Sequence, residues 1–560
     1  MAALDDDPEA ERAVRDRPPA AYWLLPALVA LLRILPYEAS LRFEPPPGGA
    51  VLQLGYMPKD TLAYLSFIRQ VAEDGSFLLV NQFTTEPQTP RFVLLLHWLL
   101  GVVCRATGLA PSQVLELSRV PLIFVFFAVL WSFLRPIFPE RRVRVLCCVL
   151  VGLAGGVDWL VEPLLRFAPP GVAWEFSMST QDVFGWSTFE GMFNPLWIAG
   201  LTLLLVALGP ILDPRGPRRV RDDVAIFGAI VLLAATHPYS AVVVAGVALS
   251  LPVVELLLGA GFDVRRHARI WLALAPALAC VALLSWWQSR DPVYRLASDN
   301  FFGPEDMSIF FYPFTFGATL VLAILGARIW VEERHPYRFA LTAWLASVVW
   351  LHSSPLVNGY HFLLYVHLPL CVFAAPALAR LWEPARLVGP ARLAGAAALA
   401  FVLFAAPFAV TWRAIGDVAR HNTFPADYGD VVLDLQRRPA GNALVPPRLG
   451  NILPAFTPHH VWVGHWFLSP DVTQRTERYQ AWTSDPARAD ELRALLAEQA
   501  IDYLVVPTER AEAVAQSLGG AVAERSAYGS VELLVLRPAD APAGAPAREM
   551  LGDARATRAN

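Results

Sequence analysis

The chain has 560 residues, of which 55% are hydrophobic and 17% charged, and its formal net charge is -4. Soluble chains carry about 25% charged residues, so the composition excludes an ordinary soluble domain and predicts a polytopic α-helical membrane protein. The near-neutral charge gives no basis for a nucleic-acid partner. The 5 cysteines lie in apolar segments without metal-ligand spacing, which indicates buried thiols rather than disulfides.

The chain begins with a polar segment and then alternates apolar and polar stretches. Residues 1–19 are charged and end in proline, and they lack a signal-peptide cleavage pattern, so we expect a cytoplasmic N-terminal tail. A span needs about 20 mostly apolar residues, and this rule predicts a transmembrane domain of about 11 helices over residues 20–412. The predicted spans lie near residues 20–37, 119–138, 145–165, 193–212, 224–237, 240–259, 270–287, 309–330, 339–352, 361–380 and 393–412.

The arginines predict the orientation of these spans. With the N-terminus inside, every cytoplasmic loop holds at least two arginines, whereas opposite loops such as THPYS hold few or none, as the positive-inside rule demands. The C-terminal region is then extracytoplasmic. Arginine has replaced lysine almost everywhere and alanine is abundant, which indicates a GC-rich bacterial genome and hence a bacterial inner membrane. The arginine-bearing loops are PERRVR, DPRGPRRVRDD, GFDVRRHAR, VEERHPYR and RLWEPARLVGPAR.

Residues 38–118 form a long first extracytoplasmic loop. Within it, Arg91–Val103 is apolar but only about 13 residues long, too short for a span. Counting it as a span would place the arginines of PERRVR outside. We therefore predict an interfacial or re-entrant helix in contact with membrane lipids.

The apolar runs long enough for a span end before residue 413, and the pattern over residues 413–538 predicts a small extracytoplasmic α/β domain. ELRALLAEQA and AEAVAQSLGG are typical of amphipathic helices, and IDYLVVP and VELLVLRP are typical of buried strands. NALVPP and HHVWVGHW add further extended segments. Residues 539–560 are rich in Ala, Pro and Arg, so we expect a disordered tail.

The stretch Gly55–Gln70, GYMPKDTLAYLSFIRQ, carries the most specific chemical signal. Asp60 stands beside Lys59, the only lysine of the chain, at the start of a segment whose apolar residues recur at helical spacing. An acid and a base at a helix start outside a membrane can hold an anionic headgroup beside a carboxylate. The simpler alternative is that Asp60 only caps an interfacial helix.

This layout resembles the GT-C superfamily of membrane glycosyltransferases, which includes protein mannosyltransferases and lipid-A aminosugar transferases. Asp60 and Tyr64 form an Asp-x-x-x-Tyr pattern at the place of the essential first-loop acid. Thr89–Gly101 takes the place of the interfacial helix that begins with proline in that superfamily. Leu449–Tyr479 is similar to a segment after the last span of several bacterial members.

The resemblance implies transfer of a hexosyl group from a polyprenyl-phosphate-linked donor to a lipid, glycan or protein acceptor, with Asp60 as general base. Many members carry a paired acid in this loop, whereas here Lys59 and Thr61 flank Asp60. The resemblance therefore implies no definite cofactor, and a divalent metal stays an open alternative. The candidate phosphate partners are Lys59, Arg69, Arg91, His237 and His361, and the other candidate substrate contacts are Tyr64, His465 and Trp466.

Each candidate has a simpler alternative. Arg69 and Arg91 fit interfacial anchors, and His361 fits a packing role. His459, His460 and His465, with neighbouring tryptophans, fit either a sugar-stacking surface or the membrane interface. The three histidines also resemble a metal site, but no carboxylate has the matching spacing, so no metal ligand is predicted. Asp182 and Glu190 are candidates for a second acid or for a solvated loop.

Two other classes of protein compete with an enzyme. A transporter or flippase for a lipid-linked sugar explains the spans but neither the long first loop nor the C-terminal domain. A non-catalytic GT-C-like membrane protein that binds a glycan or a partner would need no base, whereas Asp60 supplies one. The enzyme reading therefore accounts for more of the sequence.

Overall fold

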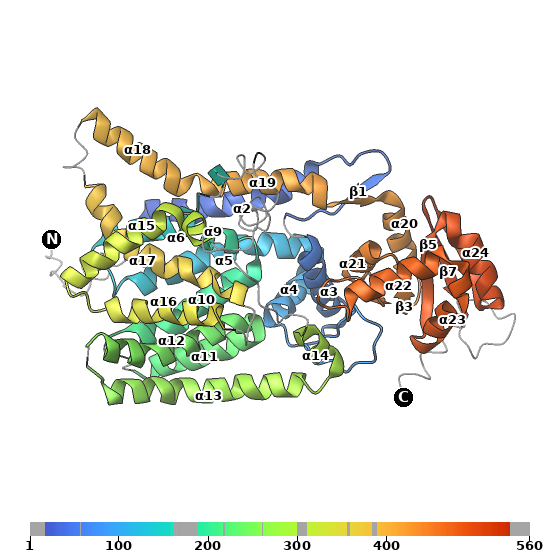
Figure 1. Cartoon of the computed structure of the whole chain (residues 1–560), viewed down its shortest axis with the longest axis horizontal. Coiled ribbons are helices and arrows are strands. Elements are labelled where there is room, and N and C mark those ends of the chain that lie inside the picture. Colours follow the sequence, from blue (N-terminus) through green and yellow to red (C-terminus); the bar gives the residue numbers. More distant parts are fainter. Residues whose placement is uncertain are drawn as a thin grey trace, which may run out of the picture. The chain divides into compact units, whose positions relative to one another are not determined.

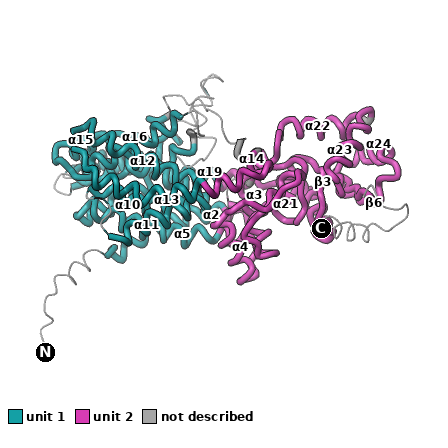
Figure 2. Tube along the Cα trace, turned by 90° about the horizontal axis from the view of Figure 1, so that it is seen from below, with its two compact units in different colours: residues 1–36, 117–282, 303–414 teal, residues 37–116, 283–302, 415–560 magenta. Residues whose placement is uncertain are grey.

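The computed structural model describes residues 17–55, 58–157, 159–160, 167, 187–214, 216, 219–259, 261–299, 311–354, 359–383 and 389–537. Asp182 and the predicted tail at 539–560 lie outside the described residues. The chain divides into two compact units, coloured separately in Figure 2. Unit 1 comprises residues 1–36, 117–282 and 303–414, and unit 2 comprises residues 37–116, 283–302 and 415–560.

Unit 1 is built from helices, many of which begin at a proline or at a polar cap. Pro195 starts one of them, and the side chain of Asn194 accepts a hydrogen bond from the Leu196 amide at 3.0 Å, which satisfies an end group of the helix. The long helices are α2 (Leu24–Arg42), α5 (Pro111–Leu134), α6 (Arg141–Leu153), α10 (Pro195–Leu212), α11 (Val220–Thr236), α12 (Pro238–Leu257), α13 (Val264–Gln288), α15 (Phe311–Glu332), α16 (Arg338–His352), α17 (Leu364–Leu381), α18 (Pro390–Phe404) and α19 (Ala406–His421) (Figure 1). One end of each of α2, α5, α13 and α19 belongs to unit 2.

Small residues let these helices approach one another closely. A side chain at Gly326 of α15 would overlap the carbonyl of Phe373 in α17, and one at Gly246 of α12 would overlap Ser347 in α16. Small residues at helix contacts are typical of membrane bundles, because packing rather than hydrophobic transfer drives association there.

Eight helices in the described part of the chain are long and apolar enough to cross a membrane. They cover Ala20–Arg42, Pro111–Leu134, Pro195–Leu212, Pro238–Leu257, Val264–Gln288, Tyr312–Glu332, Leu364–Leu381 and Pro390–His421. The remaining predicted spans fall on α6, α11 and α16, which have 13, 17 and 15 residues. The chain is thus a helical multi-pass membrane protein, as predicted, and the total of eleven spans stays a prediction.

Unit 2 joins the first long loop to the region after the last predicted span. In the first loop, α3 (Pro58–Asp74) packs on α4 (Leu95–Thr107), and the contact is so close that a side chain at Gly101 would overlap Val71. A two-stranded antiparallel sheet pairs β1 (Gly49–Val51) with β2 (Thr423–Pro425). The helix α14 (Pro292–Asp299) also belongs to this unit.

The C-terminal part of unit 2 is a mixed sheet flanked by helices, which confirms the predicted α/β region. Its strand order is β4-β3-β5-β7-β6, with β3 parallel to β4 and β5, and β7 antiparallel to β5 and β6. The strands are β3 (Asn442–Leu444), β4 (His460–Val461), β5 (Ile501–Pro507), β6 (Val522–Tyr528) and β7 (Val531–Leu536). The helices are α20 (Ala426–Leu435), α21 (Pro447–Phe456), α22 (Val472–Ser484), α23 (Ala489–Glu498) and α24 (Thr508–Leu518).

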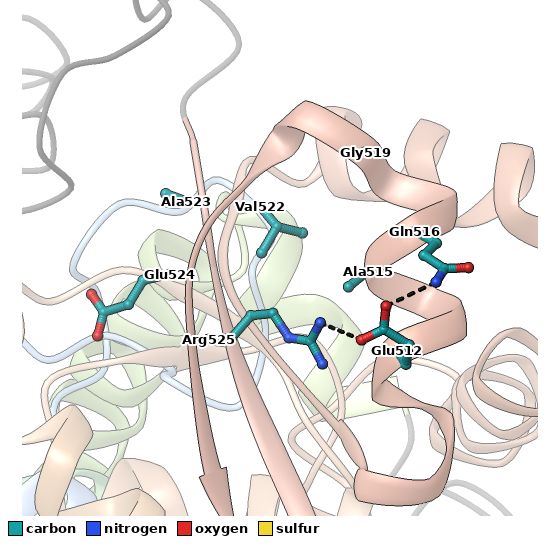
Figure 3. A pocket seen from close by; sticks show the side chains of 8 residues that line it. All are labelled: Glu512, Ala515, Gln516, Gly519, Val522, Ala523, Glu524 and Arg525. Carbon is teal, nitrogen blue, oxygen red and sulfur yellow. Dashed lines mark hydrogen bonds and ion pairs between the residues drawn. The ribbon is translucent and has the colours of Figure 1, made fainter.

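An open groove lies between α24 and the edge strand β6 (Figure 3). Its polar groups already bind one another, because Glu512 accepts hydrogen bonds from Arg525 at 2.6 Å and from Gln516 at 2.8 Å. None of the predicted site residues lines it. The groove is lined by Glu512, Ala515, Gln516, Gly519, Val522, Ala523, Glu524 and Arg525.

Candidate functional site

Helix α3 positions Asp60 in its first turn. The residues Leu62, Leu65 and Ile68 recur at helical spacing and are all buried, so they fix the rotation of the helix about its axis. The Asp60 side chain keeps 20% of its surface exposed, and the neighbouring Lys59 is exposed. The predicted amphipathic helix is therefore present and holds its acid at the surface of unit 2.

Two residues from the C-terminal region of the chain meet this carboxylate. The indole Nε1–H of Trp466 donates a hydrogen bond to Asp60 Oδ1 at 2.8 Å. His465 Nε2 lies 3.6 Å from the same oxygen. Both contacts involve Oδ1, so one hydrogen bond, from Trp466, holds the carboxylate, and the same oxygen faces His465.

The backbone around His465 assigns its tautomer. The amides of Phe467 and Leu468 both direct their N–H groups at His465 Nδ1, each at 3.4 Å. A neutral imidazole that accepts at Nδ1 carries its proton on Nε2, the nitrogen that faces Asp60. Burial lowers the pKa of His465 to about 3, so the ring is neutral at neutral pH. His465 is thus a neutral ring whose Nε2 lies 3.6 Å from the carboxylate oxygen, beyond hydrogen-bond distance.

A close backbone contact holds the turn that carries His465 and Trp466. The turn follows β4, and Gly464 lies against Gly450 of α21 so tightly that a side chain at either position would overlap the other segment. The Ser469 hydroxyl accepts hydrogen bonds from the Gly464 and His465 amides at 3.0 and 3.1 Å. It donates to the Phe83 carbonyl at 2.7 Å. The turn is therefore fixed both to α21 and to the first loop.

The surroundings of Asp60 favour a basic carboxylate. Burial raises the pKa of Asp60, while the hydrogen bond from Trp466 and the charge of Lys59 oppose that rise. An ionised carboxylate whose pKa is raised binds a proton more tightly than an ordinary carboxylate does, which suits a general base. The arrangement can therefore accept a proton beside an exposed cation.

Arg69 lies in a buried network rather than beside Asp60. Its guanidinium donates to Gln82 Oε1 at 2.6 Å and to the Pro454 carbonyl at 3.4 Å, and it forms an ion pair with Glu73. Burial lowers the pKa of this guanidinium, and the charge of Glu73 opposes the change. These contacts tie α3 to the first loop and to α21.

Arg91 and Tyr64 also have partners elsewhere in unit 2. Arg91 Nη1 donates to the Trp287 carbonyl at 3.0 Å, and its guanidinium lies 5.6 Å from the Trp287 ring centroid. Tyr64 packs against His97 of α4, with ring centroids 5.0 Å apart. Two of the predicted contacts, His465 and Trp466, thus lie against Asp60, and Lys59 is its neighbour in the chain.

His237 and His361 belong to a polar cluster of unit 1. The buried side chains of His237, Ser240 and Tyr365 contact one another, with Nδ1 of the histidine 3.0 Å from both hydroxyls and the hydroxyls 2.7 Å apart. The ring of Tyr239 lies between the two histidines, with centroids 5.8 Å from His237 and 4.8 Å from His361. The sequence HPYS thus supplies three members of one cluster.

Glu190 is buried rather than solvated. It closes a capping box at the start of α9 (Thr188–Gly191), because its carboxylate accepts a hydrogen bond from the Ser187 amide at 3.1 Å. Arg33 lies between the rings of Phe189 and Phe193 in the same region of unit 1, at 3.4 and 3.5 Å from their centroids. Charged groups inside a membrane bundle are costly unless such contacts surround them.

The three C-terminal histidines do not form a metal cluster. His459 accepts at Nδ1 from the Gly441 amide at 2.9 Å, and its Nε2 lies 2.9 Å from the Leu435 carbonyl. His460 Nδ1 lies 3.1 Å from the Thr84 carbonyl. Within the part of the chain that the structure describes, no group of three or more His, Cys, Asp or Glu side chains could hold a metal ion.

Sequence reasoning missed Ser469, Gly450 and Gly464, which position the turn. Gly464 stands directly before His465, and Gly450 follows a proline-rich segment, so both read as ordinary loop glycines. Their role depends on a contact between α21 and the turn after β4, which only the tertiary structure reveals.

Solved glycosyltransferase structures share this architecture. The apo oligosaccharyltransferase of Archaeoglobus fulgidus matches 93% of this chain and 75% of its own, with a TM-score of 0.53 and 12% identity. ArnT from Cupriavidus metallidurans, bound to undecaprenyl phosphate, matches 92% of this chain and 98% of its own, with a TM-score of 0.53 and 14% identity. The arabinofuranosyltransferase AftD from Mycobacteria matches 93% of this chain and 42% of its own, with a TM-score of 0.54 and 19% identity.

These likenesses confirm the resemblance seen in the sequence at the level of the fold. The chain has the GT-C fold of polytopic membrane glycosyltransferases. No protein-family model and no curated protein matches the sequence. The chain spans less than half the length of AftD.

Proposed function

We propose that this protein is a membrane glycosyltransferase that moves a hexosyl group from a polyprenyl-phosphate-linked donor to an extracytoplasmic acceptor. Asp60 is the general base. The observation that carries this proposal is the contact of Trp466 and His465 with one oxygen of the Asp60 carboxylate. An oriented carboxylate beside an exposed cation is what proton abstraction next to a phosphate leaving group requires.

The reaction balances as a single displacement. The oxygen of an acceptor hydroxyl attacks the anomeric carbon of the donor and forms the new glycosidic bond. The bond from that carbon to the phosphate oxygen breaks, and its electron pair leaves on the polyprenyl phosphate. The hydroxyl proton passes to Asp60 Oδ2, a transfer that contributes about 10²–10⁴-fold to the rate. The carboxyl then releases the proton to water.

Lys59 supplies positive charge on the side of the leaving group. It is exposed, and its charge lowers the pKa of Asp60, so it lies close enough to act on the same site. A fixed cation stabilises the negative charge that grows on the phosphate as the bond breaks. Undecaprenyl phosphate, the lipid bound to ArnT from Cupriavidus metallidurans, is the first donor lipid to test.

The test is an Asp60→Asn variant assayed with radiolabelled undecaprenyl-phosphate sugars and a bacterial cell-envelope extract as acceptor. Asparagine keeps the shape but cannot take the proton, so transfer should fall at least about 100-fold. The unfolding free energy of the solubilised protein should change by only about 1 kcal/mol. Asp74→Asn is the matched control, because Asp74 is exposed at the other end of α3. Near-normal transfer by Asp60→Asn would refute the proposal.

A further inference from the structure

The ring of Trp466 is a part of the site that proton transfer does not explain. The side chain keeps 47% of its surface exposed although it is bonded to Asp60. Its neighbour His465 has no exposed surface. The exposed part of this indole therefore offers an aromatic surface to a ligand directly beside the carboxylate.

Three contacts fix both the place and the tilt of this ring. Its Nε1–H binds Asp60, the His465 ring stacks near it at 6.1 Å and 26°, and the Phe467 ring meets it edge-on at 4.9 Å and 71°. The indole edge that carries the nitrogen therefore points at the carboxylate. A molecule lying on the indole plane brings its own rim to Asp60.

We infer that Trp466 is the platform on which a saccharide acceptor binds, an inference that rests on the proposed function and names its acceptor class. A sugar ring has faces lined by C–H groups, and the electron-rich face of an indole attracts them. Its hydroxyls lie at the rim. With the ring stacked on Trp466, a rim hydroxyl meets Asp60 Oδ2 and can lose its proton there.

Other acceptor classes fit these contacts less well. An extended peptide needs partners for its own amide and carbonyl groups, usually along a strand edge. An acyl chain needs an apolar groove that encloses it, whereas Trp466 has Asp60 and His465 at its edge. One aromatic plane with a polar edge is what an amphipathic sugar ring requires.

Saccharide binding can be measured without turnover. The full-length protein in detergent is probed by saturation-transfer NMR with methyl glycosides of mannose, galactose, glucose and arabinose and with their disaccharides. We expect at least one probe to bind, and Trp466→Ala to weaken it about tenfold or more, as loss of an aromatic contact does. Trp412→Ala is the control, because Trp412 is 77% exposed in α19 of unit 1.

The kinetic constants for the acceptor supply a second readout. Trp466→Phe keeps an aromatic plane but removes the N–H that holds Asp60, so kcat should fall while the acceptor KM stays within about threefold. Trp466→Ala should raise KM about tenfold or more, since the platform is lost. A merely structural role for Trp466 would lower the amount of folded protein in both variants and leave the two KM values alike.

The outcomes separate this inference from the function on which it rests. Suppose that Asp60→Asn abolishes transfer, but no saccharide binds or Trp466→Ala binds saccharides as the wild type does. Trp466 is then not the acceptor platform, whereas Asp60 remains the general base. If saccharides bind through Trp466 and Asp60→Asn still transfers normally, the base is overturned and the platform stands.

Discussion

The Nε1–H of Trp466 binds Asp60 Oδ1 at 2.8 Å, although the two residues are 406 positions apart in sequence. The bond joins the first turn of α3 to the turn that follows β4. The orientation of the carboxylate therefore depends on the C-terminal region of the chain. A change in that region should alter catalysis without touching the first loop.

Trp466→Phe tests this dependence through pH. The hydrogen bond from Trp466 lowers the pKa of Asp60, so its loss should raise that pKa further. A base works only when ionised, and the acid limb of the kcat/KM profile should move to higher pH. Titrating kcat/KM for the wild type, Trp466→Phe and Trp412→Phe checks this. An unmoved acid limb in Trp466→Phe would show that the bond does not tune Asp60.

The contact between Gly450 and Gly464 predicts the effect of a single methyl group. Gly464→Ala would drive the new side chain into the α21 backbone, which cannot yield as a flexible side chain would. We expect a loss of about 1–3 kcal/mol in unfolding free energy from this overpacking, together with lower transfer. Gly416→Ala is the control, because open space surrounds that position in α19, and alanine should stabilise the helix slightly. Equal thermal melts for Gly464→Ala and the wild type would contradict the close contact.

The sequence predicted the parts of this protein that depend on local patterns. The spacing of Leu62, Leu65 and Ile68 predicted α3, and the apolar runs IDYLVVP and VELLVLRP predicted β5 and β7. Strand β6 was missed because Val522–Tyr528 lies at a sheet edge, where Glu524 and Arg525 are exposed and break the apolar pattern.

The meeting of residues in the candidate site could not be predicted in the same way. Asp60 and Trp466 were each noticed for their chemistry, but no local pattern encodes a contact between residues so far apart. Arg69 was noticed for its charge, whereas its bonds to Gln82 and Pro454 follow from the packing of α3 on α21. Residue type predicts what a side chain can do, and tertiary packing decides which side chains meet.

His465 predicts a loss of stability in acid. Burial holds its pKa at about 3 in the folded protein, below the ordinary value of 6.5. Between pH 6.5 and pH 3 the unfolded chain binds a proton at this histidine and the folded chain does not. The contribution of His465 to the free energy of unfolding is therefore complete above about pH 6.5 and falls as the pH drops toward 3. Melting temperatures between pH 7 and pH 4 should fall less steeply in His465→Gln than in the wild type. Parallel curves for the two proteins would contradict a buried neutral His465.

Helix α4 should lie against the membrane. Its buried face packs on α3, while Leu99, Val102 and Val103 form an exposed apolar stripe at helical spacing. At 13 residues the helix is too short to span, so the stripe fits the lipid interface. Contrary to the expectation that all five thiols are buried, Cys280 is exposed, so it is first changed to Ser. In that background a spin label at Leu99→Cys should be more accessible to oxygen than to a water-soluble nickel reagent. A label at exposed Leu433 in α20 should show the reverse, and water-like accessibility at both sites would contradict the assignment.

Lys59 should bind the donor phosphate through an exposed ion pair. Its side chain lies at the surface beside Asp60, whereas Arg91 already donates to the Trp287 carbonyl. Lys59→Gln should therefore weaken binding of undecaprenyl phosphate about fivefold, the range of one partly exposed ion pair, and Arg91→Gln should weaken it less. Because salt screens exposed charges, the wild-type affinity should fall between 0.05 and about 0.5 M salt, and Lys59→Gln should show a smaller fall. Equilibrium binding of the radiolabelled lipid to solubilised protein measures both effects. If Lys59→Gln left both the affinity for undecaprenyl phosphate and its salt dependence unchanged, the phosphate would not bind beside Asp60. The proposed base would then have no leaving group next to it.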